Sequence, residues 1–117
     1  MSDRVSISTH VLDTALGLPA AGVAVTLERV EARDRAVFIA QGVTDADGRV
    51  PALVPVESSV GAGAYRLSFD VTPYFAVTQR TSFYSEISVT FTVGDDARHY
   101  HVPLLLSPFG YSTYRGS

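Results

Sequence analysis

The stretch Val5-Ser6-Ile7-Ser8-Thr9-His10-Val11 alternates apolar or β-branched side chains with polar ones. A period of two indicates a half-buried β-strand, because successive side chains of a strand point to opposite faces of its sheet. The odd-numbered residues are therefore expected to face a core. Ser6, Ser8 and His10 are expected to form a polar row on the other face.

Similar patterns, separated by turn signals, predict seven more short strands, over residues 23–30, 36–44, 49–54, 64–71, 87–93, 100–106 and 111–114. Residues 13–22 are predicted to form a loop, and Asp45-Ala46-Asp47-Gly48 a tight turn in which Gly48 can adopt a positive φ. One short helix is predicted over 72–79, with Thr72 as its N-cap and Pro73 at its first position. Together these elements predict an all-β protein, an antiparallel eight-stranded β-sandwich with one short helix.

Length and composition limit the class of protein. The chain has 117 residues, which predicts a single domain over 1–117. Its net charge is only −3 and it has no basic stretch, so no nucleic-acid partner is expected. No apolar run approaches the roughly 18 residues of a membrane span, and no membrane partner is expected. Residues 1–10 lack the apolar segment of a secretory signal, which predicts a cytoplasmic protein. A periplasmic form is the alternative if a signal had been removed.

The residue types that are missing exclude several kinds of catalysis. The chain has no cysteine, and its nine basic residues are all arginine. Thiol chemistry, Cys-based metal sites and lysine Schiff bases are therefore excluded. No Ser-His-Asp pattern surrounds the serines, which favours direct attack by water over an acyl intermediate.

The three histidines are the candidate acid–base groups. His99 and His101 share one face of a predicted strand, because side chains alternate. One alternative is that they are simply solvated side chains on a strand. Another is a metal site, in which His10 would be the third ligand.

Several segments together resemble the 5-hydroxyisourate hydrolases, the transthyretin-like enzymes of purine catabolism. The most specific are STHVLDT at 8–14, HYHVPLLLSP at 99–108 and the ending YSTYRGS at 111–117. Weaker matches lie at 44–49, where Asp-Gly-Arg occurs, and around 63–75. The Arg-Gly-Ser ending separates these hydrolases from transthyretin itself, which shares the fold. One departure is Phe83-Tyr84-Ser85-Glu86, where the family commonly has proline in place of Ser85.

The resemblance implies a fold of the transthyretin type and a hydrolase that opens the ring of 5-hydroxyisourate to 2-oxo-4-hydroxy-4-carboxy-5-ureidoimidazoline in urate degradation. It implies no cofactor and no metal, and a homotetramer, a dimer of dimers with the active sites in a channel between dimers. The implied catalytic residues are His10, Arg49, His101 and Ser117. The implied substrate-binding residues are His10, Arg49, Tyr114, Arg115, Gly116 and Ser117.

These residue types suit that reaction. Histidine has an unperturbed pKa suited to activating water near neutral pH, and arginine can hold developing charge on a carbonyl oxygen. Two other functions are considered: a non-catalytic carrier of a small ligand that uses the same channel, and an accessory module of a larger enzyme. A carrier would be expected to have an apolar channel without the histidine pair and the Arg-Gly-Ser ending.

Overall fold

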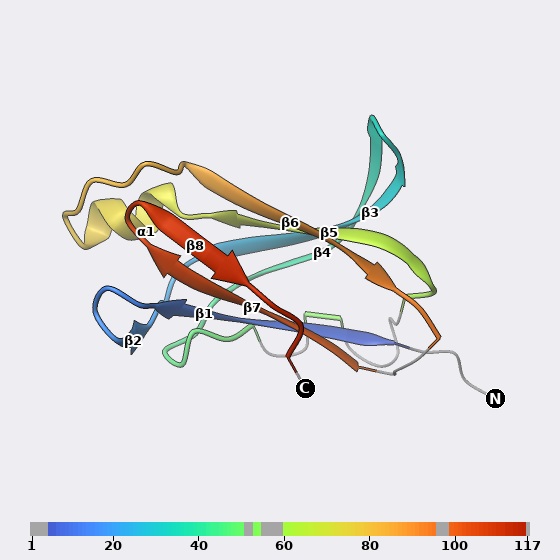
Figure 1. The fold of residues 1–117 in the computed structure, drawn as a ribbon, viewed down its shortest axis with the longest axis horizontal. Helices are drawn as coiled ribbons and strands as arrows, with labels where there is room; N and C mark the ends of the chain where they lie inside the picture. The colour runs from blue at the N-terminus through green and yellow to red at the C-terminus, as the bar shows by residue number, and fades with distance from the viewer. Residues whose placement is uncertain (1–4, 51–52, 55–59, 96–98, 117) are drawn as a thin grey trace.

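Two four-stranded sheets lie face to face in the computed structural model, which describes residues 5–50, 53–54, 60–95 and 99–116 (Figure 1). The first sheet has the order β2 (Leu18–Pro19), β1 (Ser6–Asp13), β7 (His99–Ser107) and β8 (Gly110–Thr113). The second has the order β4 (Arg35–Val43), β3 (Ala24–Ala32), β5 (Gly63–Asp70) and β6 (Glu86–Val93). The predicted sandwich of eight strands is confirmed within the described residues.

The core lies between the two sheets and follows the alternation seen in the sequence. Along β1 the even-numbered residues 6–12 are half-buried and the odd-numbered residues 7–13 are buried. Fully buried side chains from both sheets fill the space between them, among them Ile7, Val11, Leu104, Leu27, Leu67 and Phe69. The polar row of β1 therefore lies on the outer face of the sandwich, as predicted.

The pairing of β1 with β7 differs from the prediction, because these two strands run parallel. All other strand pairs described are antiparallel. The expected all-antiparallel sandwich is therefore wrong for this one pair. Alternation reports which face a side chain occupies but not the direction of the neighbouring strand, and the long chain between β1 and β7 permits either direction.

Two further details differ at the edge of the first sheet. The predicted strand over 49–54 is replaced by isolated bridges, one between Arg49 and His10 and one between Val54 and Ile7; residues 51 and 52 lie outside the described part. The predicted loop 13–22 contains the two-residue strand β2, which pairs with β1.

Helix α1 (Thr72–Val77) is shorter than predicted and begins differently. Pro73 lies in the first turn, one position later than predicted, because the capping residue is Val71, and no side chain caps the helix. The Thr72 hydroxyl instead donates a hydrogen bond to the carbonyl oxygen of Ser85, which also accepts one from the backbone of Val71. The predicted N-cap is therefore wrong, because a tertiary contact to the chain before β6 uses the hydroxyl. No helix in the described residues is long and apolar enough to cross a membrane.

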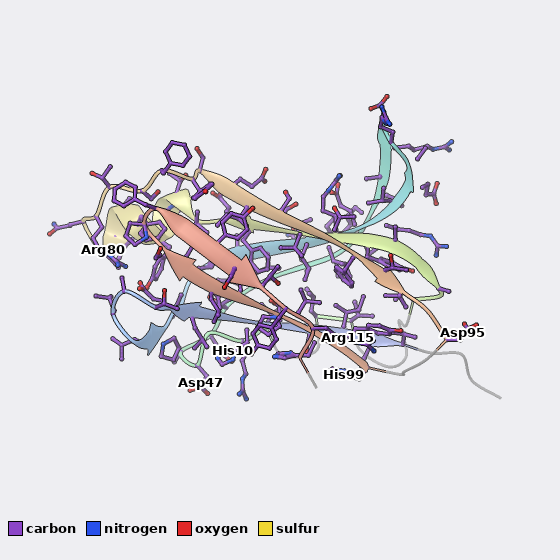
Figure 2. All side chains as sticks on the ribbon, in the orientation of Figure 1. His10, Asp47, Arg80, Asp95, His99 and Arg115 are labelled. Carbon is purple, nitrogen blue, oxygen red and sulfur yellow. The ribbon has the colours of Figure 1, made fainter. Side chains whose placement is uncertain are left out.

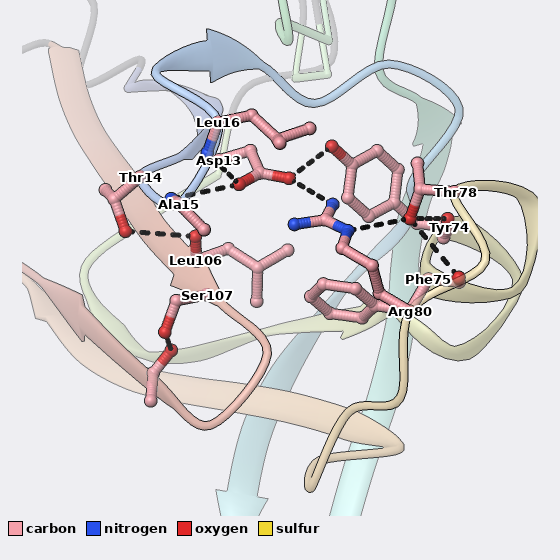
Figure 3. A network of polar contacts seen from close by, with 11 residues as sticks. Asp13, Thr14, Ala15, Leu16, Tyr74, Phe75, Thr78, Arg80, Leu106 and Ser107 are labelled. Atoms are coloured by element: carbon pink, nitrogen blue, oxygen red, sulfur yellow. Dashed lines mark hydrogen bonds and ion pairs between the residues drawn. The ribbon is translucent and has the colours of Figure 1, made fainter.

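A buried polar cluster ties α1 to the end of β1 (Figure 3). Asp13 is completely buried, and its Oδ2 accepts hydrogen bonds from the Tyr74 hydroxyl at 2.6 Å and from Arg80 Nη2 at 2.5 Å. Burial raises the pKa of Asp13, but the hydrogen bonds from Arg80 and Tyr74 outweigh it and hold that pKa below its usual range. The cationic partner of Asp13 is thus Arg80.

Candidate active site

The turn at residues 45–49 holds Arg49 beside His10. The Asp45 carboxylate accepts hydrogen bonds from the backbone N–H groups of Asp47 and Arg49, at 2.9 and 3.0 Å. Gly48 has a φ of 77°, and a Cβ there would lie 2.3 Å from the carbonyl oxygen of Val11. Only glycine fits this position, because the turn is seated directly on β1.

His10 is anchored by the same turn. Its Nε2 lies 2.8 Å from the carbonyl oxygen of Asp47. Since a carbonyl only accepts, Nε2–H must be the donor, and in neutral His10 the unprotonated nitrogen is Nδ1. The turn therefore determines which nitrogen of His10 can act as a base.

His101 lies next to His10 on the outer face of the first sheet. Their ring centroids are 6.5 Å apart, and the His99 ring is stacked 6.5 Å from His101 on the other side. Figure 2 shows His10, Asp47 and His99 along the outer side of the β1–β7 sheet, whereas Arg80 lies beside α1. The predicted grouping of the histidines on one face is confirmed.

The environment of His101 favours its neutral form. Partial burial lowers the pKa of His101 below the ordinary 6.5. Repulsion from positive charge on His10, His99 and Arg49 lowers this pKa further. A neutral imidazole at neutral pH is the form that can accept a proton.

The end of the chain returns to His101. The backbone N–H of Gly116 donates to the carbonyl oxygen of His101 at 2.8 Å, and the two residues form a β-bridge. The Arg115 guanidinium lies over the ring of Tyr100, 4.5 Å from its centroid. Tyr114 and Arg115 are exposed and Gly116 is half-buried. Ser117, which the sequence places in the site, lies outside the described residues.

Sequence reasoning missed one member of this cluster, Ser8. Its hydroxyl lies 2.8 Å from His101 Nδ1 and 3.1 Å from His99 Nε2. Ser8 was recognised only as part of the polar row, because the contact depends on the parallel register that places it opposite His101. Within the described residues no three His, Asp or Glu side chains are grouped so as to hold a metal ion.

Comparisons with known proteins identify the family of the chain. The model of the HIUase/Transthyretin family matches residues 7–116. A 5-hydroxyisourate hydrolase of Deinococcus radiodurans is 45% identical, over 100% of both chains. The solved 5-hydroxyisourate hydrolase of Klebsiella pneumoniae is 34% identical, with a TM-score of 0.80, over 97% of this chain and 94% of that one.

Transthyretin itself has the same architecture. Sea bream transthyretin, solved in complex with thyroxine, is 34% identical with a TM-score of 0.86, over 95% of this chain and 94% of that one. Both the hydrolases and transthyretin are thus similar to this chain along almost its whole length. The chain belongs to the HIUase/Transthyretin family.

Proposed function

We propose that this protein is a 5-hydroxyisourate hydrolase, which adds water across a ring amide of 5-hydroxyisourate to give 2-oxo-4-hydroxy-4-carboxy-5-ureidoimidazoline. One observation carries the proposal: His10, Arg49 and His101 lie together on one outer face of the sandwich. Gly116 packs against His101 there. The hydrolase names of relatives that match the full chain support the same activity.

In the proposed mechanism the two histidines share the activation of water. His10 offers Nδ1, because its Nε2–H is held by Asp47. His101 is kept neutral by its surroundings and can also accept a proton. Arg49 is exposed next to His10, where its guanidinium can orient the substrate and stabilise the oxyanion formed on attack. Tyr114, Arg115, Gly116 and Ser117 would shape the pocket. This chemistry requires no cofactor or metal.

We also propose that residues 1–117 form one domain that assembles as a homotetramer, a dimer of dimers, in the cytoplasm. An outer sheet face with three histidines needs a second surface to exclude water from the reaction, and a second subunit would supply it. Exposed aromatic side chains at and beside the edge strand β8 support assembly, namely Phe83, Phe109 and Tyr111. Light scattering tests it: a mass near four times 12.5 kDa is expected, and a fully active monomer would contradict it.

A carrier of a small ligand is the second candidate, since sea bream transthyretin with the same fold was solved with thyroxine. The polar histidine cluster argues against it, because burying unneeded polar groups in a carrier site would weaken binding of an apolar ligand.

The experiment that separates the two mixes urate and urate oxidase and follows ultraviolet absorbance with and without this protein. Because the intermediate also decays spontaneously, the protein is added at several concentrations. A hydrolase increases the decay rate in proportion to its concentration, at far less than one protein per substrate. A rate that stays at the spontaneous value would reject the hydrolase, and saturable slowing would favour the carrier.

A further inference from the structure

A continuous line of polar contacts runs across the outer face of β1 and β7. His101 Nδ1 lies 2.8 Å from the Ser8 hydroxyl, and that hydroxyl lies 3.1 Å from His99 Nε2. The other nitrogen of His99, Nδ1, lies 2.6 Å from the Ser6 hydroxyl. We call these four residues, Ser6, His99, Ser8 and His101, the Ser–His chain.

The parallel register builds this line. Ser6 lies opposite His99 and Ser8 opposite His101, and alternation puts all four side chains on the outer face. Ser6, Ser8 and His101 are half-buried, whereas His99 is exposed, so the line reaches solvent at His99. The Ser–His chain therefore leads from the candidate active site to solvent.

Its groups can pass a proton in either direction. A hydroxyl has one hydrogen to donate and two lone pairs, and a neutral imidazole donates from one nitrogen and accepts at the other. In one arrangement His101 Nδ1–H donates to the Ser8 hydroxyl. The Ser8 hydroxyl then donates to His99 Nε2, and His99 Nδ1–H donates to the Ser6 hydroxyl. His101 Nε2 then carries the lone pair of a base. In the other arrangement the direction of every hydrogen bond is reversed, and the hydrogen of His101 is on Nε2 instead of Nδ1.

The proposed reaction needs a proton exit. Water adds its oxygen to the attacked carbonyl carbon and one hydrogen to the leaving nitrogen as the C–N bond breaks. The new carboxylic acid has a pKa of about 4 and ionises at neutral pH. Each turnover therefore releases one proton into a site that the proposed second subunit would shield from bulk water.

We propose that Ser8 and His99 carry this proton from His101 to solvent, an inference that rests on the proposed function. His101 Nε2 takes the product's proton and becomes imidazolium. Its Nδ1 proton then passes to Ser8, the Ser8 proton to His99 Nε2, and the His99 Nδ1 proton to Ser6 and solvent. When product has left, water takes the Nε2 proton of His101. The Ser–His chain takes up one proton from solvent at its outer end and returns one to His101 Nδ1, so two protons leave and one comes back. One proton is released in total. Ser8 and His99 act through His101 and are positioning residues.

The test compares Ser8→Ala with wild type in buffers of increasing imidazole concentration at constant pH and ionic strength. Ser8→Ala should lower kcat by about 10-fold with KM little changed, less than the roughly 10²-fold expected for removing an acid–base group itself. Imidazole should restore much of this loss, while wild type stays independent of it. Ser8→Thr, which keeps the hydroxyl, should retain most of kcat.

Two further variants test whether the effect of Ser8→Ala reflects proton transfer. His99→Gln changes an exposed position and keeps a polar side chain that cannot relay a proton, so it should show the same dependence on imidazole. Ser68→Ala is the matched control, because Ser68 is a strand serine on the second sheet whose hydroxyl lies 3.3 Å from that of Ser88; it should behave as wild type.

The outcomes separate this inference from the proposed function. Wild-type kcat in Ser8→Ala would overturn the proton path, and so would a loss that imidazole does not restore, because a structural defect cannot be bypassed by an external base. If wild type does not accelerate the reaction at all, the proposed function fails. Nitrogen NMR of the imidazoles then still tests the Ser–His chain: Ser8→Ala must change the tautomer populations of His101, and unchanged populations would overturn it.

Discussion

Gly116 packs against the imidazole of His101 so closely that a Cβ on Gly116 would lie 2.6 Å from His101 Cδ2. The same glycine donates its backbone N–H to the carbonyl oxygen of His101. Gly116 therefore fixes the position of this ring in two ways. Its N–H bonds to the backbone of His101, and its lack of a side chain leaves room for the imidazole.

Gly116→Ala is expected to lower activity by about 10²-fold, because a methyl group must displace the ring by roughly 1 Å, enough to spoil the geometry of a reacting group. Steady-state rates on the folded variant measure this. Gly110→Ala is the matched control, since a Cβ there would meet nothing closer than the Ser107 hydroxyl at 3.7 Å. Equal activity of the two variants would show that the Gly116 contact has no part in catalysis.

His10→Ala and His101→Ala should each reduce turnover by about 10²-fold or more while the fold survives, because each removes a half-buried acid–base group from the outer face and leaves the core intact. Rates are measured beside circular dichroism and light scattering. Wild-type turnover in both variants would eliminate the two-histidine mechanism.

The lowered pKa of His101 predicts an acid limb of kcat/KM with an apparent pKa below 6.5. Activity should persist slightly below that pH and fall as the imidazole takes up a proton. The free energy of unfolding should also decrease in acid. Folding disfavours the charged form of His101, so stability that is present above the unfolded pKa is lost as pH falls through the folded pKa. Rate profiles between pH 5 and 8 test it, and a flat profile would argue against a histidine base.

Arg80→Met should destabilise the fold, because it leaves the Asp13 carboxylate buried without its cation. Loss of one partner of a buried pair costs several kcal/mol, and the partial exposure of Arg80 reduces this to about 2 kcal/mol. Urea unfolding measures it. Arg66→Met is the control, since Arg66 pairs with Glu28 in a more exposed ion pair and should cost below about 1 kcal/mol. Equal losses in the two variants would contradict this difference.

The same pair predicts a pH dependence of stability. The pKa of Asp13 is held below its usual value, so its contribution is present above about pH 4 and is lost as pH falls through the folded pKa. The difference in unfolding midpoint between wild type and Arg80→Met should therefore narrow in acid. A constant difference down to pH 2 would show that the pair does not stabilise through the ionised carboxylate.

A tag appended after Ser117 should reduce activity far more than a tag before Met1. The extension adds residues next to Gly116, whose backbone contacts His101. The comparison is made on variants that are equally folded and have the same mass in light scattering. Equal rates for both tag placements would show that the tail is not part of the active site.

The face that each strand side chain occupies follows from the amino-acid pattern alone, because a strand alternates strictly and burial follows hydrophobicity. The polar row of Ser6, Ser8 and His10 on β1, and the shared face of His99 and His101 on β7, were predicted correctly on that basis. The tight turn at Gly48 was also predicted, from its turn chemistry. The candidate residues His10, Arg49 and His101 came from the resemblance of short motifs.

How these rows of side chains meet depends on the three-dimensional packing of the strands. Period-two patterns contain no information on the direction or register of a neighbouring strand that is distant in the chain. The parallel pairing of β1 with β7 therefore could not be predicted, nor could the placement of Ser8 between His99 and His101. The same holds for Thr72, whose hydroxyl was expected to cap the helix and instead bonds to Ser85. In each case the deciding contact joins residues that are far apart in the chain and that only the packed fold brings within reach.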